Sequence, residues 1–195
     1  RVAALEGGSA AVCVASGMSA IFCALTAIVS QGDHIVASAN MYGCNISLLK
    51  NTFPRFGITS TFVDPTDIDA IEAAIQNNTK IVFGELIGNP GLSVMDIEAV
   101  AKICKKHHLP LMIDGTFNTP YLCRCFDYGA NIIVHSLTKW MGGHGTSIGG
   151  VVVDGGNFDW GASKKYPTLT EEYAPFSGIN FWEEFGPSAF ATRIR

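Results

Sequence analysis

The sequence predicts an α/β fold in which a mostly parallel β-sheet is layered with helices. The first observation behind this prediction is a regular alternation, along most of the chain, between apolar runs of strand length and amphipathic segments of helix length. Such an alternation is typical of parallel strands that are joined by crossover helices. The second observation is the composition, because 195 residues with 48% hydrophobic and 15% charged residues supply enough apolar surface for one core.

Each element is predicted from a local pattern. Seven apolar runs have the length and composition of buried strands: Ala11–Ala15, His34–Ser38, Thr59–Val63, Ile81–Glu85, Leu111–Asp114, Asn131–His135 and Ser147–Val153. Four segments between them are predicted helices: Gly17–Val29, Ile46–Phe53, Ile68–Gln76 and Ile97–His107. Asp67 and Asp96 directly precede the last two helices, and we expect them to act as N-caps because an Asp side chain accepts hydrogen bonds from a free first turn.

The regular alternation fades from about Gly155 onward, where aromatic residues mix with Pro and Gly. We therefore divide the chain into residues 1–155, a ligand-binding core, and residues 156–195, an irregular aromatic and Pro-rich segment that continues the same domain. The chain begins at Arg1 without an initiator Met, and we expect it to be part of something larger.

Composition and charge argue against several classes of protein. The net charge of -4 and the pI near 5.7 leave no basic surface for nucleic acid. The stretch Ala10–Val29 is as apolar as a membrane span, but Ser16 and Gly17 interrupt it and no Lys or Arg cluster flanks it, so we expect no membrane segment. The six cysteines lack the spacing of a metal site, and without a secretory signal we expect reduced thiols, no bound metal and a cytoplasmic protein.

Polar residues follow the predicted strands, and an open parallel sheet binds its ligands outside these carboxyl ends. After the first strand, Ser16-Gly17-Met18-Ser19 opens a helix whose free N–H groups favour a phosphate, although the same turn is equally common as a structural one. After the second strand, Tyr42 offers an aromatic face, with a packed turn residue as the alternative. The fifth strand ends at Asp114, whose carboxylate is costly to desolvate and therefore requires a positive partner.

The sixth strand leads into Ser136, Thr138 and Lys139, and a glycine loop at residues 142–145 follows. A lone Lys is usually a solvated amine, but here two hydroxyls, an aromatic side chain, a carboxylate and a helix N-terminus are expected on the same rim. Pyridoxal 5′-phosphate (PLP) requires this inventory: an amine nucleophile, a carboxylate for the pyridine nitrogen and a phosphate cradle. The freed amine is also suited to moving protons on substrate carbons.

Six motifs are spread over nearly the whole chain: Glu6-Gly7-Gly8, Ser16-Gly17-Met18, Met41-Tyr42-Gly43, Glu85 with Asn89-Pro90, Asp114-Gly115-Thr116-Phe117 and His135-Ser136-Leu137-Thr138-Lys139. Taken together, they resemble the Cys/Met-metabolism PLP-dependent enzyme family, the cystathionine γ-synthase-like group of fold type I. The resemblance implies a three-layer α/β sandwich with a mostly parallel sheet, which is the large domain of these enzymes. It also implies that residues 1–155 bind PLP.

The resemblance implies roles for individual residues. Two would be catalytic: Lys139, which would hold PLP as a Schiff base and move protons, and Tyr42, which would assist departure of the leaving group. The cofactor-binding set would be Gly17, Met18, Tyr42, Asn89, Asp114, Thr116, Ser136, Thr138 and Lys139. Four of these would hold the phosphate: Gly17, Met18, Ser136 and Thr138. Asp114 would pair with the pyridine nitrogen, Asn89 would approach the 3-hydroxyl, and Tyr42 would stack on the ring.

Within this family, residues 142–151, Phe158-Asp159-Trp160 and Phe185-Gly186-Pro187 are most similar to the sulfhydrylases that act on O-acetylhomoserine. The implied reaction is a γ-replacement in which O-acetyl-L-homoserine and sulfide give L-homocysteine and acetate, a step of methionine biosynthesis. Cys44 keeps a methionine γ-lyase-like γ-elimination open, because these lyases often have Cys at this place. Cystathionine γ-synthase activity and a catalytically incomplete cofactor-binding fragment are further alternatives.

The chain also departs from the family pattern. Residues 86–88 differ from the usual ones, and Gly115 replaces a usual Asn, which is expected to loosen the pocket around Asp114. We expect the chain to be the large-domain portion only, without the N-terminal arm and the C-terminal domain of the family. Because the arm reaches a neighbouring subunit, the resemblance implies a homo-oligomer, a dimer or a tetramer, whose partners are a small amino-acid substrate and sulfide.

Overall fold

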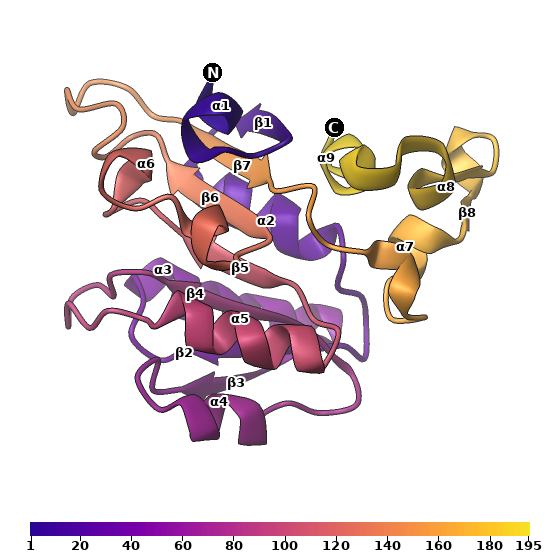
Figure 1. Cartoon of the computed structure of the whole chain (residues 1–195), viewed down its shortest axis with the longest axis horizontal. Helices are drawn as coiled ribbons and strands as arrows, with labels where there is room; N and C mark the ends of the chain where they lie inside the picture. The colour runs from indigo at the N-terminus through magenta and orange to yellow at the C-terminus, as the bar shows by residue number, and fades with distance from the viewer.

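The computed structural model describes residues 1–195 and contains one seven-stranded sheet (Figure 1). Its strands are β1 (Ala10–Val14), β2 (His34–Ser38), β3 (Thr59–Val63), β4 (Thr79–Glu85), β5 (Leu111–Asp114), β6 (Ile132–Ser136) and β7 (Gly150–Asp154). Their order is β1-β7-β6-β5-β4-β2-β3, and every neighbouring pair from β6 to β3 is parallel. The predicted mostly parallel sheet is thus confirmed, with all seven strands at or near their predicted positions.

β7 is the one strand that runs in the opposite direction, since it is antiparallel to both of its neighbours, β6 and β1. β1 therefore runs in the same direction as β2 to β6. The carboxyl ends of six strands consequently lie at one edge of the sheet, which is where a ligand is expected in this class of fold.

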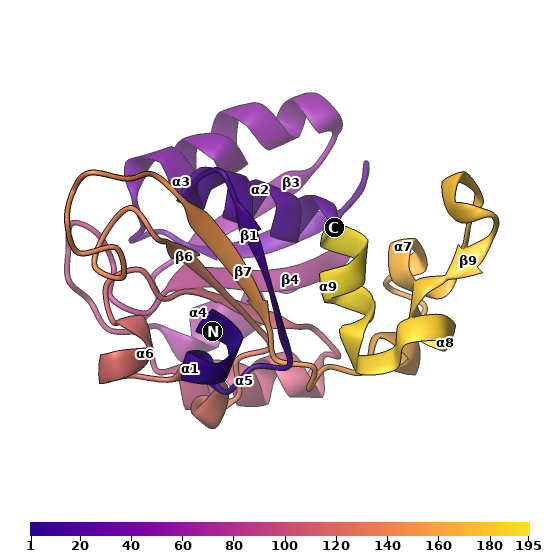
Figure 2. The same ribbon diagram turned by 90° about the horizontal axis from the view of Figure 1, so that it is seen from above.

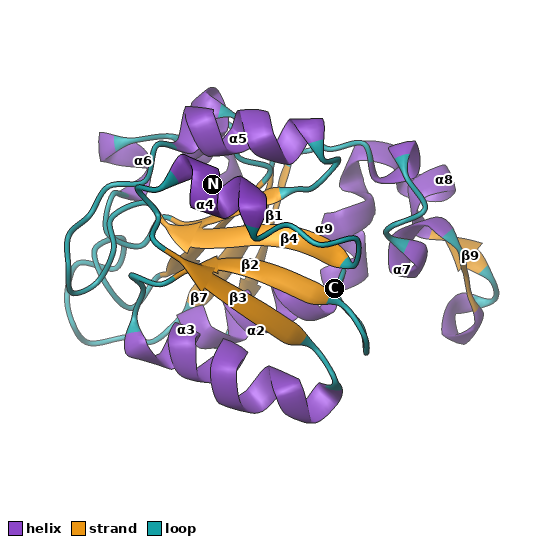
Figure 3. Cartoon of the chain, turned by 90° about the horizontal axis from the view of Figure 1, so that it is seen from below, coloured by secondary structure: helices purple, strands orange, loops and turns teal.

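Helices cover both faces of the sheet and complete a three-layer sandwich. Those of the first 155 residues are α1 (Val2–Glu6), α2 (Gly17–Thr26), α3 (Gly43–Ser47), α4 (Ile68–Ala73), α5 (Ile97–Lys106) and α6 (Thr119–Leu122). Figure 3 shows α4 and α5 over one face and α2 and α3 over the other. None of the helices combines the length and the apolar character that a membrane span requires.

The buried side chains form one cluster on each side of the sheet. In β6, Ile132 and Val134 pack into the cluster beneath α2, whereas Ile133 packs into the cluster beneath α5. Successive side chains of a strand point to opposite faces, so a strand that is covered on both sides must be apolar at nearly every position. This requirement explains why the strands of this chain are continuous apolar runs in the sequence.

The two predicted N-caps are confirmed. The Asp67 side chain accepts from the N–H of Ala70 at 2.9 Å, and the Asp96 side chain accepts from the N–H of Ala99 at 3.0 Å. Ser16 caps α2 in the same way and accepts from the N–H of Ser19 at 3.1 Å. Each cap satisfies a first-turn donor that has no partner within its own helix.

Two predicted elements differ from the structure. The segment predicted as one helix over Ile46–Phe53 consists of the end of α3, a π-helical turn at Leu48–Thr52 and a 3₁₀ turn at Phe53–Phe56. Pro54 has no N–H to donate and restricts the residue before it, so the regular α-helical pattern does not continue through it. The strand predicted from Ser147 begins only at Gly150 because the Gly149 peptide bonds to the Thr138 hydroxyl instead.

Residues 156–195 contain only short elements: α7 (Pro167–Thr170), β8 (Glu172–Tyr173), β9 (Ile179–Asn180), α8 (Phe181–Phe185) and α9 (Ala189–Ile194). They gather beside one end of the sheet (Figure 2). Four of their aromatic residues nevertheless belong to the cluster beneath α2: Trp160, Tyr166, Phe181 and Phe190. The ring centroid of Trp160 lies 5.0 Å from that of Tyr166 and 5.4 Å from that of Phe190. The division at residue 155 stays a prediction.

Candidate active site

A cavity of about 730 Å³ opens at the carboxyl ends of the strands. It is lined by all nine residues of the predicted cofactor-binding set: Gly17, Met18, Tyr42, Asn89, Asp114, Thr116, Ser136, Thr138 and Lys139. Ten further residues complete the lining: Ser16, Ile21, Asn45, Glu85, Ile87, Phe117, Trp140, Gly143, Gly145 and Ile148. Segments that are far apart in the sequence thus meet around one space, because the parallel strands deliver their carboxyl ends to the same edge.

The N-terminus of α2 forms one wall of this cavity. α2 has ten residues and begins at Gly17, so its first-turn N–H groups face outward with the positive end of the helix dipole. A Cβ atom on Gly17 would lie 2.6 Å from the Cβ of Ser136, which means that only glycine lets the helix end approach the end of β6 so closely. Backbone donors and a hydroxyl therefore face the same volume, and this combination suits a phosphate.

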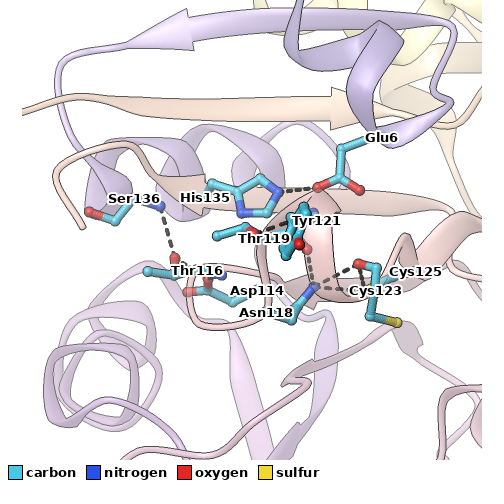
Figure 4. A network of polar contacts seen from close by, with 10 residues as sticks. All are labelled: Glu6, Asp114, Thr116, Asn118, Thr119, Tyr121, Cys123, Cys125, His135 and Ser136. Carbon is cyan, nitrogen blue, oxygen red and sulfur yellow. Dashed lines mark hydrogen bonds and ion pairs between the residues drawn. The ribbon is translucent and has the colours of Figure 1, made fainter. Parts of the chain in front are cut away.

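Asp114, the last residue of β5, presents its carboxylate to the cavity. Its Oδ1 atom accepts from the N–H of Thr116 at 3.0 Å and from the hydroxyl of Thr116 at 2.5 Å (Figure 4). Desolvation raises the pKa of the Asp114 carboxyl, while the bonds from Thr116 and the charge of His135 act in the opposite direction. The positive partner that we expected is not a Lys or Arg, since none of the ion pairs involves Asp114.

Glu85 ends β4 directly opposite Asp114 and organises the adjacent wall. One of its oxygens accepts from the N–H of Tyr42 at 2.7 Å and from the side-chain amide of Asn45 at 2.9 Å, and the other accepts from the N–H of Asn89 at 3.1 Å. Glu85 is 5% exposed, and burial, together with the nearby charge of Asp114, raises its pKa to about 7. One buried carboxyl thus holds two of the predicted cofactor-binding residues in place.

Tyr42 lies at the mouth of the cavity, where it is 46% exposed. A hydrogen bond with the thiol of Cys44 raises the pKa of the Tyr42 phenol above its ordinary value. The phenol is therefore protonated at neutral pH, as an ordinary Tyr phenol is. Cys44, which the resemblance marked as a departure, thus acts on the predicted catalytic phenol.

Lys139 lines another part of the cavity, in the segment that follows β6. The Thr138 hydroxyl accepts from the N–H of Gly149 at 3.2 Å and lies 3.3 Å from the Gly149 carbonyl oxygen, which anchors the segment that carries Lys139. Lys139 and Trp140 are exposed, so the amine is accessible from the cavity mouth.

Some lining residues were not identified from the sequence. Asn45 is 1% exposed, and the oxygen of its side chain has no hydrogen-bond partner in the protein. Asn45 follows Tyr42 by three residues and lies on the first turn of a helix, so the sequence could have placed its side chain at the same edge of the sheet as Tyr42. Glu85 was recognised as part of the motif with Asn89-Pro90 but was given no role in the site, although it ends an apolar strand just as Asp114 does.

The family model described as Cys/Met metabolism PLP-dependent enzyme matches residues 1–178. The chain belongs to this family. Members of the Cys/Met-metabolism PLP-dependent family are enzymes that use PLP, and the cavity fits this cofactor in three independent places. The helix end at Gly17 meets a hydroxyl, Asp114 supplies a buried carboxylate without a Lys or Arg partner, and Lys139 supplies an accessible amine.

Curated family members are similar over nearly the whole chain. It is 49% identical to the O-acetyl-L-homoserine sulfhydrylase of Leptospira meyeri over 186 residues, which are 95% of this chain and 42% of that protein. It is 47% identical to the homocysteine synthase of Schizosaccharomyces pombe over 197 aligned positions, which cover 100% of this chain and 46% of that protein. The chain therefore spans less than half the length of these curated relatives.

A solved family structure has the same fold. The crystal structure of a protein described as a putative O-acetylhomoserine (thiol)-lyase from Campylobacter jejuni matches with a TM-score of 0.95 and 34% identity. The match covers 99% of this chain and 48% of that one. That structure contains a pyridoxyl-lysine monophosphate residue, which is a lysine covalently joined to the cofactor. The comparison confirms the fold-type I architecture that was predicted from the sequence.

Proposed function

We propose that this chain is the cofactor-binding portion of a PLP-dependent sulfhydrylase that converts O-acetyl-L-homoserine and sulfide to L-homocysteine and acetate. The observation that carries this proposal is the meeting of all nine predicted residues around one cavity at the carboxyl edge of the sheet. The reaction is inferred from the names of the relatives, which include O-acetyl-L-homoserine sulfhydrylase and homocysteine synthase.

The walls of the cavity are assigned to different parts of the cofactor. The phosphate would be held by the N-terminus of α2 at Gly17 and Met18 and by the hydroxyls of Ser136 and Thr138, all of which line the cavity. On the neighbouring walls, Asp114 would pair with the pyridine nitrogen, Asn89 would approach the 3-hydroxyl and Tyr42 would cover the ring. Thr116 holds the Asp114 carboxylate in position through two hydrogen bonds, so its part in binding is indirect.

The chemistry follows from these positions. When bound, PLP serves as an electron sink that makes protons on the substrate carbons removable. Lys139 would hold the cofactor through its amine and would move protons between these carbons. Tyr42, whose phenol is protonated at neutral pH, would donate to the departing acetate oxygen. Apolar lining residues such as Ile21 and Phe117 reduce the access of water to the reacting groups.

We further propose a cytoplasmic homo-oligomer. Three large side chains at the cavity mouth are exposed in the single chain: Tyr42 at 46%, Trp140 at 64% and Ile148 at 77%. Exposed apolar side chains gathered around one opening favour a covering surface, and a second copy of the chain is the simplest one. All six cysteines are unpaired, which suits a reducing compartment. Sedimentation of the purified protein measures the number of subunits.

The cofactor assignment is tested by titrating the purified chain with PLP, reducing the mixture with borohydride and locating the fixed label by peptide mass spectrometry. We expect the label on Lys139 and its loss in Lys139→Ala, with Lys102→Ala as the control because Lys102 lies on the exposed face of α5. A label that persists in Lys139→Ala at the same level contradicts the assignment.

The reaction is tested separately on protein that is loaded with PLP and has not been treated with borohydride. Release of homocysteine from O-acetyl-L-homoserine, only when sulfide is present, supports γ-replacement. Release of an α-keto acid and ammonia from methionine without sulfide identifies γ-elimination instead, which the contact between Cys44 and Tyr42 makes the second candidate.

A further inference from the structure

A carboxylate and an imidazole are buried against each other beside the candidate site (Figure 4). Glu6 is the last residue of α1 and His135 lies in β6, and both residues are 0% exposed. The Nε2 atom of His135 and the Oε1 atom of Glu6 form a short hydrogen bond. Replacing a buried ion pair by apolar residues is often neutral or even stabilising, so stability alone does not account for this pair.

The His135 ring lies between Glu6 and the turn that contains Asp114 (Figure 4). A Cβ atom on Gly115 would lie 2.6 Å from the Cε1 atom of His135 and 3.3 Å from each ring nitrogen. The edge of the imidazole therefore packs directly against the backbone that joins Asp114 to Thr116. Gly115, which was expected to loosen the pocket around Asp114, instead allows this close approach.

A polar link joins the two sides of this contact. The hydroxyl of Thr116 donates to Asp114 and accepts from the N–H of Ser136 at 2.9 Å, and Ser136 directly follows His135. The Nδ1 atom of His135 and the Oε2 atom of Glu6 have no hydrogen-bond partner in the protein. The ring is thus held on one side only, by Glu6, and its other nitrogen is not committed to another side chain.

The remaining charged and titratable groups around Asp114 and Glu6 are few. On the neighbouring strand β4, Glu85 lies opposite Asp114, and the two like charges repel each other. Tyr42 and Lys139 line the same cavity. Behind the pair lie the thiols of Cys123 and Cys125. Burial raises their pKa values, and the nearby charge of Glu6 raises them further. The charge of His135 is the one that lowers the pKa of Asp114.

We propose that Glu6 and His135 are positioning residues for Asp114: Glu6 holds the His135 ring against the Asp114–Thr116 turn, where the ring favours the anionic form of the Asp114 carboxyl. His135 lies nearer to the turn than Glu6 does, so the effect of His135 on Asp114 outweighs that of Glu6 (Figure 4). The inference rests on the proposed function, in which an anionic Asp114 pairs with the pyridine nitrogen of PLP.

The test follows the titration of Asp114 in the full chain without PLP. The protein is labelled with ¹³C at the aspartate carboxyl, and the Asp114 signal is assigned with Asp114→Asn. We expect the midpoint of the Asp114 titration to move to higher pH in both Glu6→Gln and His135→Phe. The matched control is Glu72→Gln, which alters an exposed Glu–His pair, since Glu72 accepts from the Nε2 atom of His107 at 2.7 Å. This control leaves the midpoint in place.

A purely structural role does not predict this shift. Glu6→Gln keeps the shape of the side chain and a hydrogen bond to His135, so it decides the question if His135→Phe does not fold. An Asp114 midpoint in folded Glu6→Gln that equals the wild-type value overturns the proposal. Because the measurement needs no cofactor, its failure is distinct from a failure of PLP to label Lys139, which concerns the proposed function.

Discussion

Replacing Glu85 by Gln is expected to change how the stability of the chain without cofactor depends on pH. Burial raises the pKa of Glu85 from 4.5 to about 7 in the folded chain. The folded state therefore binds this proton more tightly than the unfolded chain does. The stabilisation is fully present below pH 4.5, decreases as the pH rises through the folded pKa near 7 and has disappeared above it.

The magnitude follows from the size of the shift. A change of one pKa unit corresponds to about 1.4 kcal/mol, so the full effect on the free energy of unfolding is about 3 kcal/mol. Between pH 5 and pH 8 the wild-type chain is expected to lose about 2 to 3 kcal/mol through Glu85 alone. Glu85→Gln cannot ionise, so this part of the pH dependence is absent from the variant.

The variant also carries a cost that does not depend on pH. A Gln side chain offers one acceptor oxygen in place of two, whereas three N–H donors from Tyr42, Asn45 and Asn89 face Glu85. A buried donor without an acceptor costs about 1 to 3 kcal/mol. The informative quantity is therefore the change in the free energy of unfolding between pH 5 and pH 8, in which this constant cost cancels.

Urea denaturation at the two pH values, followed by circular dichroism, supplies this quantity. Glu98→Gln is the matched control, because Glu98 is an exposed carboxylate of α5 in a surface pair with Lys102. We expect the control to lose as much stability as the wild type between the two pH values, and Glu85→Gln to lose less. If the three proteins lose the same amount, burial does not raise the pKa of Glu85 and the reasoning is wrong.

Two further predictions concern the walls of the cavity. Gly17→Ala places a Cβ 2.6 Å from the Cβ of Ser136 and pushes the end of α2 away from β6, so we expect PLP to bind at least about tenfold more weakly in equilibrium titrations. Gly43→Ala, whose Cβ meets nothing within 4 Å, is the control that keeps the wild-type affinity. Thr116→Val removes the hydroxyl between Asp114 and Ser136, and we expect it to lower the free energy of unfolding by about 1 to 3 kcal/mol. Thr116→Ser keeps the hydroxyl and is expected to keep the wild-type free energy of unfolding. Equal urea midpoints for these two variants contradict that expectation.

Local patterns in the sequence were sufficient for most of the sheet and for the predicted residues of the site. A strand that is covered on both faces must be apolar throughout, and this requirement makes β2, β5 and β6 visible as uninterrupted runs. The residues that follow such runs are confined to one edge of the sheet. For this reason Tyr42, Asp114 and Lys139, which are widely separated in the sequence, were expected at one site and line one cavity.

The direction of β7 and its place in the sheet depend on tertiary structure. The apolar run at Val151–Val153 reads the same whether the strand is parallel or antiparallel, and no local signal shows that β1 pairs with a strand about 140 residues later. The helix beyond Ile46 illustrates a related limit. Its apolar spacing fits an α-helix, whereas the structure contains a π-helical and a 3₁₀ turn there.

The electrostatics of the site also arise from contacts between distant segments. Glu85 accepts three hydrogen bonds from the start of α3 and from the loop that follows β4, and its pKa depends on how completely these segments exclude water. Glu6 reaches His135 across 129 positions of sequence. Sequence patterns indicate which secondary structure a segment prefers and which face of that helix or strand is buried. The proton that a buried group holds depends instead on which other charges lie within a few ångströms, and folding is what brings those charges together.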